Sequence, residues 1–291
     1  MYRLNLRTAA SLTVAATGVV ALAAVTPAVA APSDTLPEAA QRTVSVATYN
    51  IHQAAGADGV LSLDRIAGVL RDSGAEIIGL QEVDNHWGSR SEFADQAQEL
   101  ADRLSMNVCY SANLDNAPVA GQTHRQQYGT AILSSYKLRN CTNTPLPNHP
   151  RGEQRGLAQA DINVRGTTFR FFNTHLTHNS TPGRLAQAKV VNDIVTATTT
   201  PSVLVGDLNA RPDSAEYPVF TSVLSDVWPV AGEGVGYTFD SDDPKGRIDY
   251  ILTSSDVTPR SAEVIETIAS DHMPVVAEVT LPHPGDVHAA R

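Results

Sequence analysis

The chain has 291 residues, of which 42% are hydrophobic and 18% charged, and its formal net charge is −10. This composition excludes a disordered chain, and the acidic balance argues against a protein that wraps nucleic acid by bulk charge. It still allows a nuclease, which needs only a local cationic cleft. No stretch after residue 30 reaches the roughly 20 apolar residues of a transmembrane helix.

The first 30 residues have the pattern of a cleavable export signal. Arg3 and Arg7 supply a positive start, residues 9–25 form an uncharged run rich in Ala, Val and Leu, and residues 28–30 place small side chains at a cleavage position. We therefore expect a secreted, extracellular protein without a transmembrane segment. Residues 31–42 are expected to form a flexible leader.

The chain contains two cysteines, Cys109 and Cys141, which are too few for a disulfide scaffold or a cysteine-based zinc site. In an oxidising compartment they are able to form one disulfide, worth roughly 3–4 kcal/mol. The sequence does not give the distance between their Cα atoms, so the pairing stays open.

Short β-branched runs alternate with amphipathic helices along the rest of the chain. Helices are expected from Leu63 to a stop at Gly74, from Phe93 to Leu104, and from a Thr181-Pro182 cap to about Val195. The glycine-rich segment 231–246 is expected to be a surface loop. Many late strands favour two packed sheets with helices outside over one doubly wound sheet. The expected strands are residues 44–51, 76–83, 106–110, 128–134, 157–164, 168–175, 202–207, 247–253 and 273–281.

Polar residues gather at strand ends, where the apolar runs stop. Because strand ends at one edge of a sheet sandwich converge in space, we expect these side chains to share a pocket. They are Asn50, Glu82, His175, Asp207, Asn209, and the neighbours Asp271 and His272 before the last strand.

Asp249 differs because it lies within the apolar strand RIDYILT. A charge in such a strand needs a partner, and His272 is the candidate.

These residue types suit hydrolysis of a phosphoester. A divalent cation on oxygen ligands neutralises the phosphate, and we take Glu82 as the first Mg²⁺ ligand, completed by Asn50 and Asp271. An Asp–His pair is able to orient and activate a water molecule, and asparagine holds the transition-state oxygens without adding repulsion.

Seven strings in this order resemble the endonuclease/exonuclease/phosphatase superfamily, which includes deoxyribonuclease-like and sphingomyelinase-like metal-dependent phosphohydrolases. They are TYNIH, LQEVD, YGTAIL, NTHL, GDLNA, RIDYIL and SDHMPV, and they run from Val44 to about Leu281. The resemblance implies an α/β fold, a four-layer α-β-β-α sandwich of two mixed, mainly antiparallel sheets. It implies a catalytic domain over residues 43–282, followed by a short tail, 283–291.

The resemblance also implies roles at the matching positions. Glu82 would be the main metal ligand, and His272 the catalytic histidine, held by Asp249. Asp207 would orient the attacking water, and either Asp207 or His272 would be the base. The remaining implied roles are Asn50 and Asp271 beside the metal, Asn209 on the phosphate, His175 at the leaving group, and Arg211 as a substrate contact.

Two further residues are open between a substrate-binding and a structural role. Tyr128 either faces the phosphate or packs as an aromatic side chain, and Arg155 either forms a phosphate fork or lies on the surface. A modest cationic stretch over residues 116–160 favours an anionic substrate.

The sequence therefore predicts a secreted Mg²⁺-dependent phosphodiesterase, with Mn²⁺ as the other metal. Its partner is a phosphoester substrate, either nucleic acid or a phospholipid head group, and it acts as a monomer without an obligate protein partner. The alternatives are an extracellular endonuclease, a sphingomyelinase- or phospholipase C-like lipid phosphodiesterase, and a secreted binding protein that has lost turnover.

Overall fold

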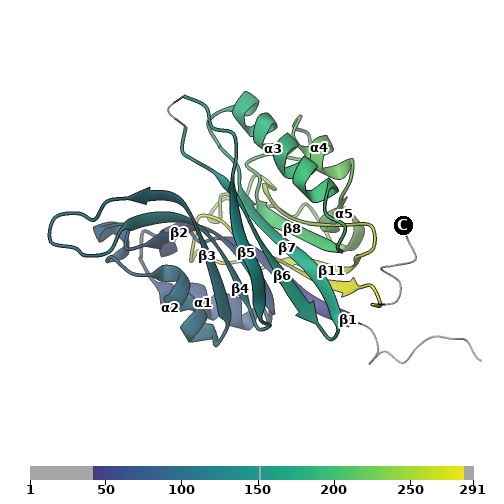
Figure 1. Ribbon diagram of the computed structural model, residues 1–291, viewed down its shortest axis with the longest axis horizontal. Coiled ribbons are helices and arrows are strands. Elements are labelled where there is room, and N and C mark those ends of the chain that lie inside the picture. The colour runs from purple at the N-terminus through teal and green to yellow at the C-terminus, as the bar shows by residue number, and fades with distance from the viewer. Residues whose placement is uncertain (1–41, 151, 285–291) are drawn as a thin grey trace, which may run out of the picture. The chain divides into compact units, whose positions relative to one another are not determined.

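Two six-stranded sheets form the centre of the part of the chain that the structure, a computed structural model, describes: residues 42–150 and 152–284 (Figure 1). The predicted export signal, almost all of the leader, and residues 285–291 of the tail lie outside these residues. No helix within the described ranges is long and apolar enough to cross a membrane.

The first sheet has the strand order β11-β12-β1-β2-β4-β3. β1 and β2 are parallel and every other neighbouring pair is antiparallel. The strands are β1 (Arg42–Asn50), β2 (Ile77–Asn85), β3 (Asn107–Asn116), β4 (Gln126–Ser134), β11 (Thr258–Val264) and β12 (Val275–Leu281).

The second sheet has the order β5-β6-β7-β8-β10-β9, in which only β7 and β8 are parallel. β10 begins at Asp249, so this residue starts its strand instead of lying inside it as predicted. The strands are β5 (Leu138–Pro145), β6 (Gly156–Val164), β7 (Thr167–His175), β8 (Ser202–Asp207), β9 (Ser225–Asp226) and β10 (Asp249–Thr253).

Three apolar clusters define four layers. Val46 of the first sheet and Phe171 and Val205 of the second belong to the core between the sheets. The outer face of the first sheet packs against α1 (Leu63–Asp72) and α2 (Gln96–Leu104), and that of the second against α3 (Thr181–Thr196) and α4 (Tyr217–Thr221). The predicted α-β-β-α sandwich of mainly antiparallel sheets is confirmed.

Helices α2 and α3 begin where their capping residues stand, and not where the spacing of apolar residues begins. Ser180, not Thr181, caps α3: its hydroxyl oxygen accepts a hydrogen bond from the Gly183 backbone N–H at 3.1 Å. The helix predicted from Phe93 begins only at Gln96, because Phe93 has a φ of 57° and Asp95 caps the helix. The sequence reading also missed β5, β9, β11, α4 and α5 (Val227–Ala231), which are short or largely exposed elements.

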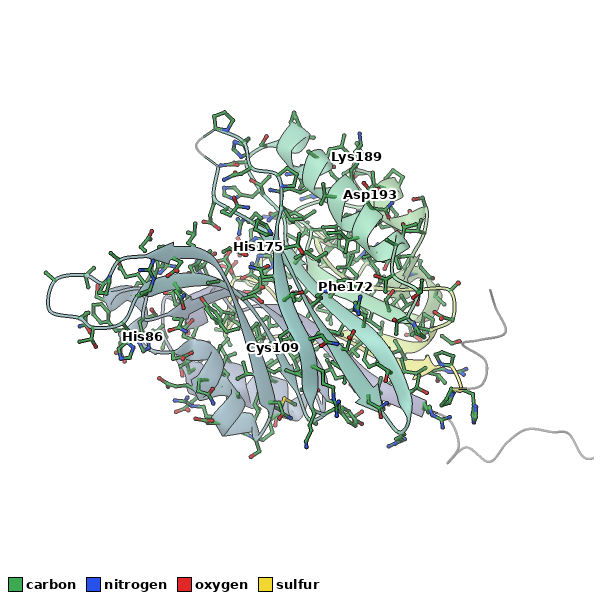
Figure 2. All side chains as sticks on the ribbon, viewed as in Figure 1. His86, Cys109, Phe172, His175, Lys189 and Asp193 are labelled. Carbon is green, nitrogen blue, oxygen red and sulfur yellow. A yellow bond between two sulfur atoms is a disulfide. The ribbon has the colours of Figure 1, made fainter. Side chains whose placement is uncertain are left out.

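Cys109 and Cys141 form a disulfide, with their Cα atoms 6.2 Å apart. Cys109 lies in β3 (Figure 2) and Cys141 in β5, and these are edge strands of different sheets. The bond therefore joins the two sheets covalently at one side of the sandwich.

Candidate active site

The strand ends predicted to converge do meet at one edge of the sandwich. Asp207, at the end of β8, pairs with His175 across the parallel β7–β8 ladder and with Asp249 across the antiparallel β8–β10 ladder. Asn50, at the end of β1 in the other sheet, donates from Nδ2 to Asp207 Oδ2 at 3.1 Å. Residues separated by more than 150 positions are thus in direct contact.

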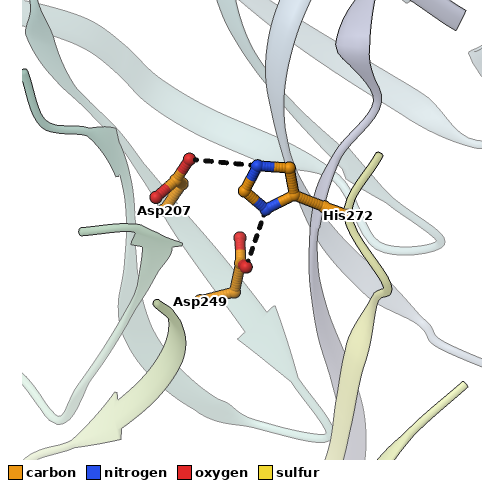
Figure 3. Close-up of side chains that lie close together, drawn as sticks. All are labelled: Asp207, Asp249 and His272. Atoms are coloured by element: carbon orange, nitrogen blue, oxygen red, sulfur yellow. Dashed lines mark hydrogen bonds and ion pairs between the residues drawn. The ribbon is translucent and has the colours of Figure 1, made fainter. Parts of the chain in front are cut away.

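Asp249 and His272 form the predicted pair (Figure 3). His272 Nδ1 lies 2.9 Å from Asp249 Oδ2, and Nε2 of the same ring faces Asp207 Oδ2 at 3.7 Å. Both carboxylates and the imidazole are almost fully buried. Because a carboxylate only accepts, the short contact places a proton on Nδ1 and directs Nε2 toward Asp207.

Two further residues, of which Thr238 was not predicted, support this pair. The Thr238 hydroxyl donates to Asp249 Oδ2 at 2.6 Å, and the Phe239 ring packs on the His272 imidazole with centroids 4.8 Å apart. Both belong to the segment predicted as a surface loop. A threonine in a glycine-rich segment carries no signal of this role, since only the fold places it beneath Asp249.

Burial and neighbouring charges shift the pKa values of His272 and Asp207. Burial lowers the pKa of His272, but the negative charges of Asp249 and Asp207 outweigh it and raise the pKa to about 10. Burial, followed by the charge of Asp249, raises the pKa of Asp207 to about 7. The centre therefore favours a proton on His272 and raises the proton affinity of Asp207.

Glu82 approaches this centre through an irregularity in its strand. The β2–β4 register shifts between Leu80 and Val83, and Glu82 has a left-handed φ of 55°. Its Oε1 lies 3.2 Å from Asn50 Nδ2, and that nitrogen is also 3.4 Å from His272 Nε2. The Asn50 amide therefore links Glu82, Asp207 and His272, residues predicted to share one pocket.

These residues fit a divalent cation by the chemistry of their donors. The carboxylates of Glu82 and Asp207 face one point around Asn50, and Asp249 Oδ1 is buried without a hydrogen-bond partner. Ligand atoms of Asp207, Asp249 and His272 lie within 4.8 Å of one another. Hard oxygen donors with excess negative charge are what Mg²⁺ or Mn²⁺ binds.

The other two predicted ligands are placed less directly. Asn50 presents its nitrogen to the carboxylates, while its Oδ1 accepts from the His52 backbone N–H at 3.1 Å. Asp271 lies at the rim, where its carboxylate contacts His52 Nδ1 at 3.7 Å and the Ser270 hydroxyl at 3.3 Å. Their ligand roles remain predictions.

Buried His175 and Arg155 form a second group beside Asp207 with the partly buried Asn209. The Asn209 backbone N–H donates to Asp207 Oδ1 at 2.8 Å, and its Nδ2 lies 3.1 Å from His175 Nε2. Arg155 is 3% exposed and contacts His175 Nδ1 through Nη1 at 2.9 Å. It is therefore not a surface arginine, which was one of the two roles left open. Burial and then the charge of Arg155 hold the pKa of His175 well below its usual range.

Tyr128 and Arg211 do not belong to this hydrogen-bonded network. Tyr128 is buried and packs against Trp87 and beneath the Arg90 guanidinium, 5.4 Å from the ring centroid. This arrangement favours the packed-aromatic role. Arg211 is exposed and lines a separate cavity with Tyr237 and Lys245. Their substrate contacts stay predictions.

A four-layer sandwich with a buried Asp–His pair in a cluster of carboxylates defines a phosphoesterase-type fold and site. The family model of the Endonuclease/Exonuclease/phosphatase family matches residues 47–272, and the chain belongs to this family. Members of the family are hydrolases that act on phosphoester bonds and generally depend on divalent metals.

Solved structures of other proteins share the fold. An endonuclease/exonuclease/phosphatase from Beutenbergia cavernae DSM 12333 is 24% identical, with 83% of this chain and 72% of that chain covered and a TM-score of 0.71. A mannosyl-6-phosphatase from Bacteroides thetaiotaomicron VPI-5482 is 20% identical (81% and 99% covered, TM-score 0.65). The human Nocturnin catalytic domain with bound sulfate is 21% identical (82% and 94% covered, TM-score 0.62). No curated protein sequence matches the chain.

Proposed function

We propose that this protein is a divalent-metal-dependent phosphodiesterase that cleaves its substrate with an activated water molecule. The observation that carries the proposal is the Asp249–His272 pair, held at 2.9 Å and directed at Asp207 and Asn50. A structural ion pair has no need of a second buried carboxylate opposite the histidine, since the added charge is costly to bury. An acid–base centre uses such a cluster to shift proton affinities.

The residues divide the chemistry as follows. Glu82, with Asn50, would hold the cation, which neutralises phosphate charge when bound. Asp207 takes the proton of the attacking water, because its raised pKa makes it a better base near neutral pH. His272, already protonated and fixed by Asp249, donates from Nε2 to a phosphate oxygen. The Asn209 backbone N–H holds Asp207 in place.

Hydrolysis of bis-p-nitrophenyl phosphate tests the reaction class. We expect p-nitrophenol release with Mg²⁺ or Mn²⁺, loss of release in EDTA, and loss in His272→Ala. Asp161→Asn is the matched control, because Asp161 on β6 pairs with Arg170 on β7, and neither is a residue of the site. Absence of turnover in every condition, with His272→Ala no different, would favour the binding-protein alternative.

Glu82→Gln tests the metal assignment. The variant keeps the shape of the side chain and removes its charge, so we expect either no turnover or a metal requirement raised by about tenfold or more. The readout is the Mg²⁺ dependence of p-nitrophenol release. An unchanged rate at limiting Mg²⁺ would remove Glu82 from the site.

Two substrate classes compete within this reaction. The cationic stretch over residues 116–160 gives little support to a nucleic-acid substrate, because Arg125 is paired with Asp115 and Arg155 is buried. Val235 and Tyr237 are 66% and 40% exposed and line a cavity with Met273, the residue after His272, and this apolar surface supports a lipid phosphodiesterase as the second candidate. A plasmid-nicking assay beside a sphingomyelin and phospholipid release assay separates the two.

We also propose that the protein is exported. The pattern of residues 1–30 and the Cys109–Cys141 disulfide support this, because disulfides persist in oxidising compartments. Mass spectrometry of the protein recovered from culture medium would detect cleavage near residue 30. Full-length protein retained inside the cell would overturn export.

A further inference from the structure

His175 is enclosed by polar groups on both ring nitrogens. Its Nδ1 lies 2.9 Å from Arg155 Nη1, and its Nε2 lies 3.3 Å from Asp207 Oδ2 and 3.1 Å from Asn209 Nδ2. The imidazole is 3% exposed. Which nitrogen carries the proton is therefore decided by these three neighbours.

Arg155 settles the Nδ1 side. A guanidinium group has five N–H donors and no acceptor, so its contact with Nδ1 is possible only if Nδ1 offers a lone pair. The same Nη1 forms an ion pair with Glu153 Oε1 at 2.8 Å, which keeps the guanidinium in place. A neutral imidazole without a proton on Nδ1 must carry it on Nε2.

The groups around Nε2 are compatible with a proton on this nitrogen. Asp207 Oδ2 is a hydrogen-bond acceptor at 3.3 Å from Nε2. Asn209 Nδ2 is a donor and cannot accept the proton, but it has its own acceptor in the Leu176 carbonyl at 2.9 Å. Asp207 Oδ2 is therefore the acceptor that faces Nε2, within ion-pair distance.

We propose that Arg155 is a positioning residue that fixes His175 as the neutral Nε2–H tautomer and makes it a hydrogen-bond donor to Asp207. The two histidines around Asp207 then differ: His272 carries its fixed proton on Nδ1, toward Asp249, and His175 carries it on Nε2. His175 thereby orients the carboxylate and does not protonate the leaving group, the role that the family resemblance implied. The tautomer itself is independent of the proposed function, and only its catalytic effect rests on it.

The tautomer is measured by ¹H–¹⁵N correlation spectra of ¹⁵N-histidine-labelled protein, with His175 assigned by its absence in His175→Asn. In the wild-type protein at pH 7 we expect an unprotonated Nδ1 and a protonated Nε2. A proton on Nδ1, or on both nitrogens, would overturn the proposal even if no Arg155 variant folds.

Three variants connect the tautomer to Arg155. Arg155→Met removes the donor, so we expect the Nδ1 signal to move toward the protonated position. Arg155→Lys, which also only donates, should keep the wild-type pattern. Arg184→Met is the matched control, because it removes a largely buried arginine paired with Glu216 on another element. The same tautomer in Arg155→Met as in the wild type would show that Arg155 does not fix it.

Kinetics separate this inference from the proposed function. With bis-p-nitrophenyl phosphate we expect Arg155→Met to lower kcat by about tenfold or more, with Arg155→Lys restoring most of it. A wild-type kcat in Arg155→Met with a changed tautomer would overturn the catalytic effect. A wild-type enzyme without turnover would refute the proposed function and leave the tautomer result standing.

Discussion

At the scale of single residues, the Asp249 carboxylate shows why a buried charge is kept at this site. Its Oδ2 contacts His272 and Thr238, while its Oδ1 is buried without a hydrogen-bond partner. A buried charge that is only partly satisfied costs stability, and its presence at the pocket is understandable if it orients the imidazole.

The variant Asp249→Asn should therefore lower kcat by about 100-fold or more while the protein stays folded. An amide facing Nδ1 no longer favours the proton there, so the orientation and tautomer of His272 are lost. The measurement is p-nitrophenol release beside circular dichroism, with Asp161→Asn as control. Turnover at the wild-type rate would show that His272 needs no orienting residue.

His272 also makes stability depend on pH. Its pKa of about 10 in the folded protein lies above the ordinary 6.5, so the folded state holds a proton that the unfolded chain releases. This contribution is fully present below pH 6.5 and is lost as the pH rises through about 10. We expect the free energy of unfolding, measured in urea with EDTA, to fall across this window, and to fall less in His272→Gln. Equal slopes in the two proteins would assign the effect to another group.

At the scale of elements, edge strands are where the sandwich needs support. β3 and β5 each have a neighbour on one side only, and the Cys109–Cys141 disulfide joins them across the two sheets. A bond that closes a loop of this length restricts the unfolded chain strongly.

The double variant Cys109→Ser/Cys141→Ser should lower the free energy of unfolding by about 4 kcal/mol. Denaturant titration of both proteins, with and without reductant, measures the difference. Reductant should bring the wild-type protein to the stability of the variant and leave the variant unchanged. A wild-type protein that is insensitive to reductant would show that the bond contributes no stability.

At the scale of the whole molecule, buried polar contacts link the two sheets beneath the pocket. Asn173 on β7 donates to the backbone carbonyls of Leu80 and Ala131, both at 2.9 Å, and accepts from Gln81 Nε2 at 2.7 Å. Gly79 permits this approach, because a Cβ there would lie 2.4 Å from Val205 and 2.9 Å from Asn173. The network thus fixes how the strand ends of one sheet face those of the other.

Asn173→Ala should destabilise the protein by about 3 kcal/mol, since it removes the donor to two buried carbonyls and the shortest hydrogen bond of the Gln81 amide. Turnover should also fall, because Asn50 and Asp207 belong to different sheets and their contact depends on this spacing. Urea unfolding and p-nitrophenol release measure the two effects, with the exposed Asn163→Ala as control. Loss of less than about 0.5 kcal/mol would show that the network does not hold the sheets together.

Local patterns in the sequence were sufficient for much of this protein. Apolar runs predicted most strands, polar residues at their ends predicted the pocket, and the charge of Asp249 in an apolar strand predicted its pairing with His272. The sequence predicts these features because each of them involves only a few adjacent residues: an apolar run that is buried, or a single charge within such a run.

Only the tertiary structure decided the rest. It placed Thr238 beneath Asp249, Arg155 on His175, and Asp271 at the rim beside His52. It also directed the Glu82 side chain toward Asn50 through an irregularity in β2, and it brought the two cysteines together. These contacts depend on how the two sheets pack against each other. Two residues that are far apart in the chain can touch without changing the pattern of apolar and polar residues around either of them, so the pattern does not reveal the contact.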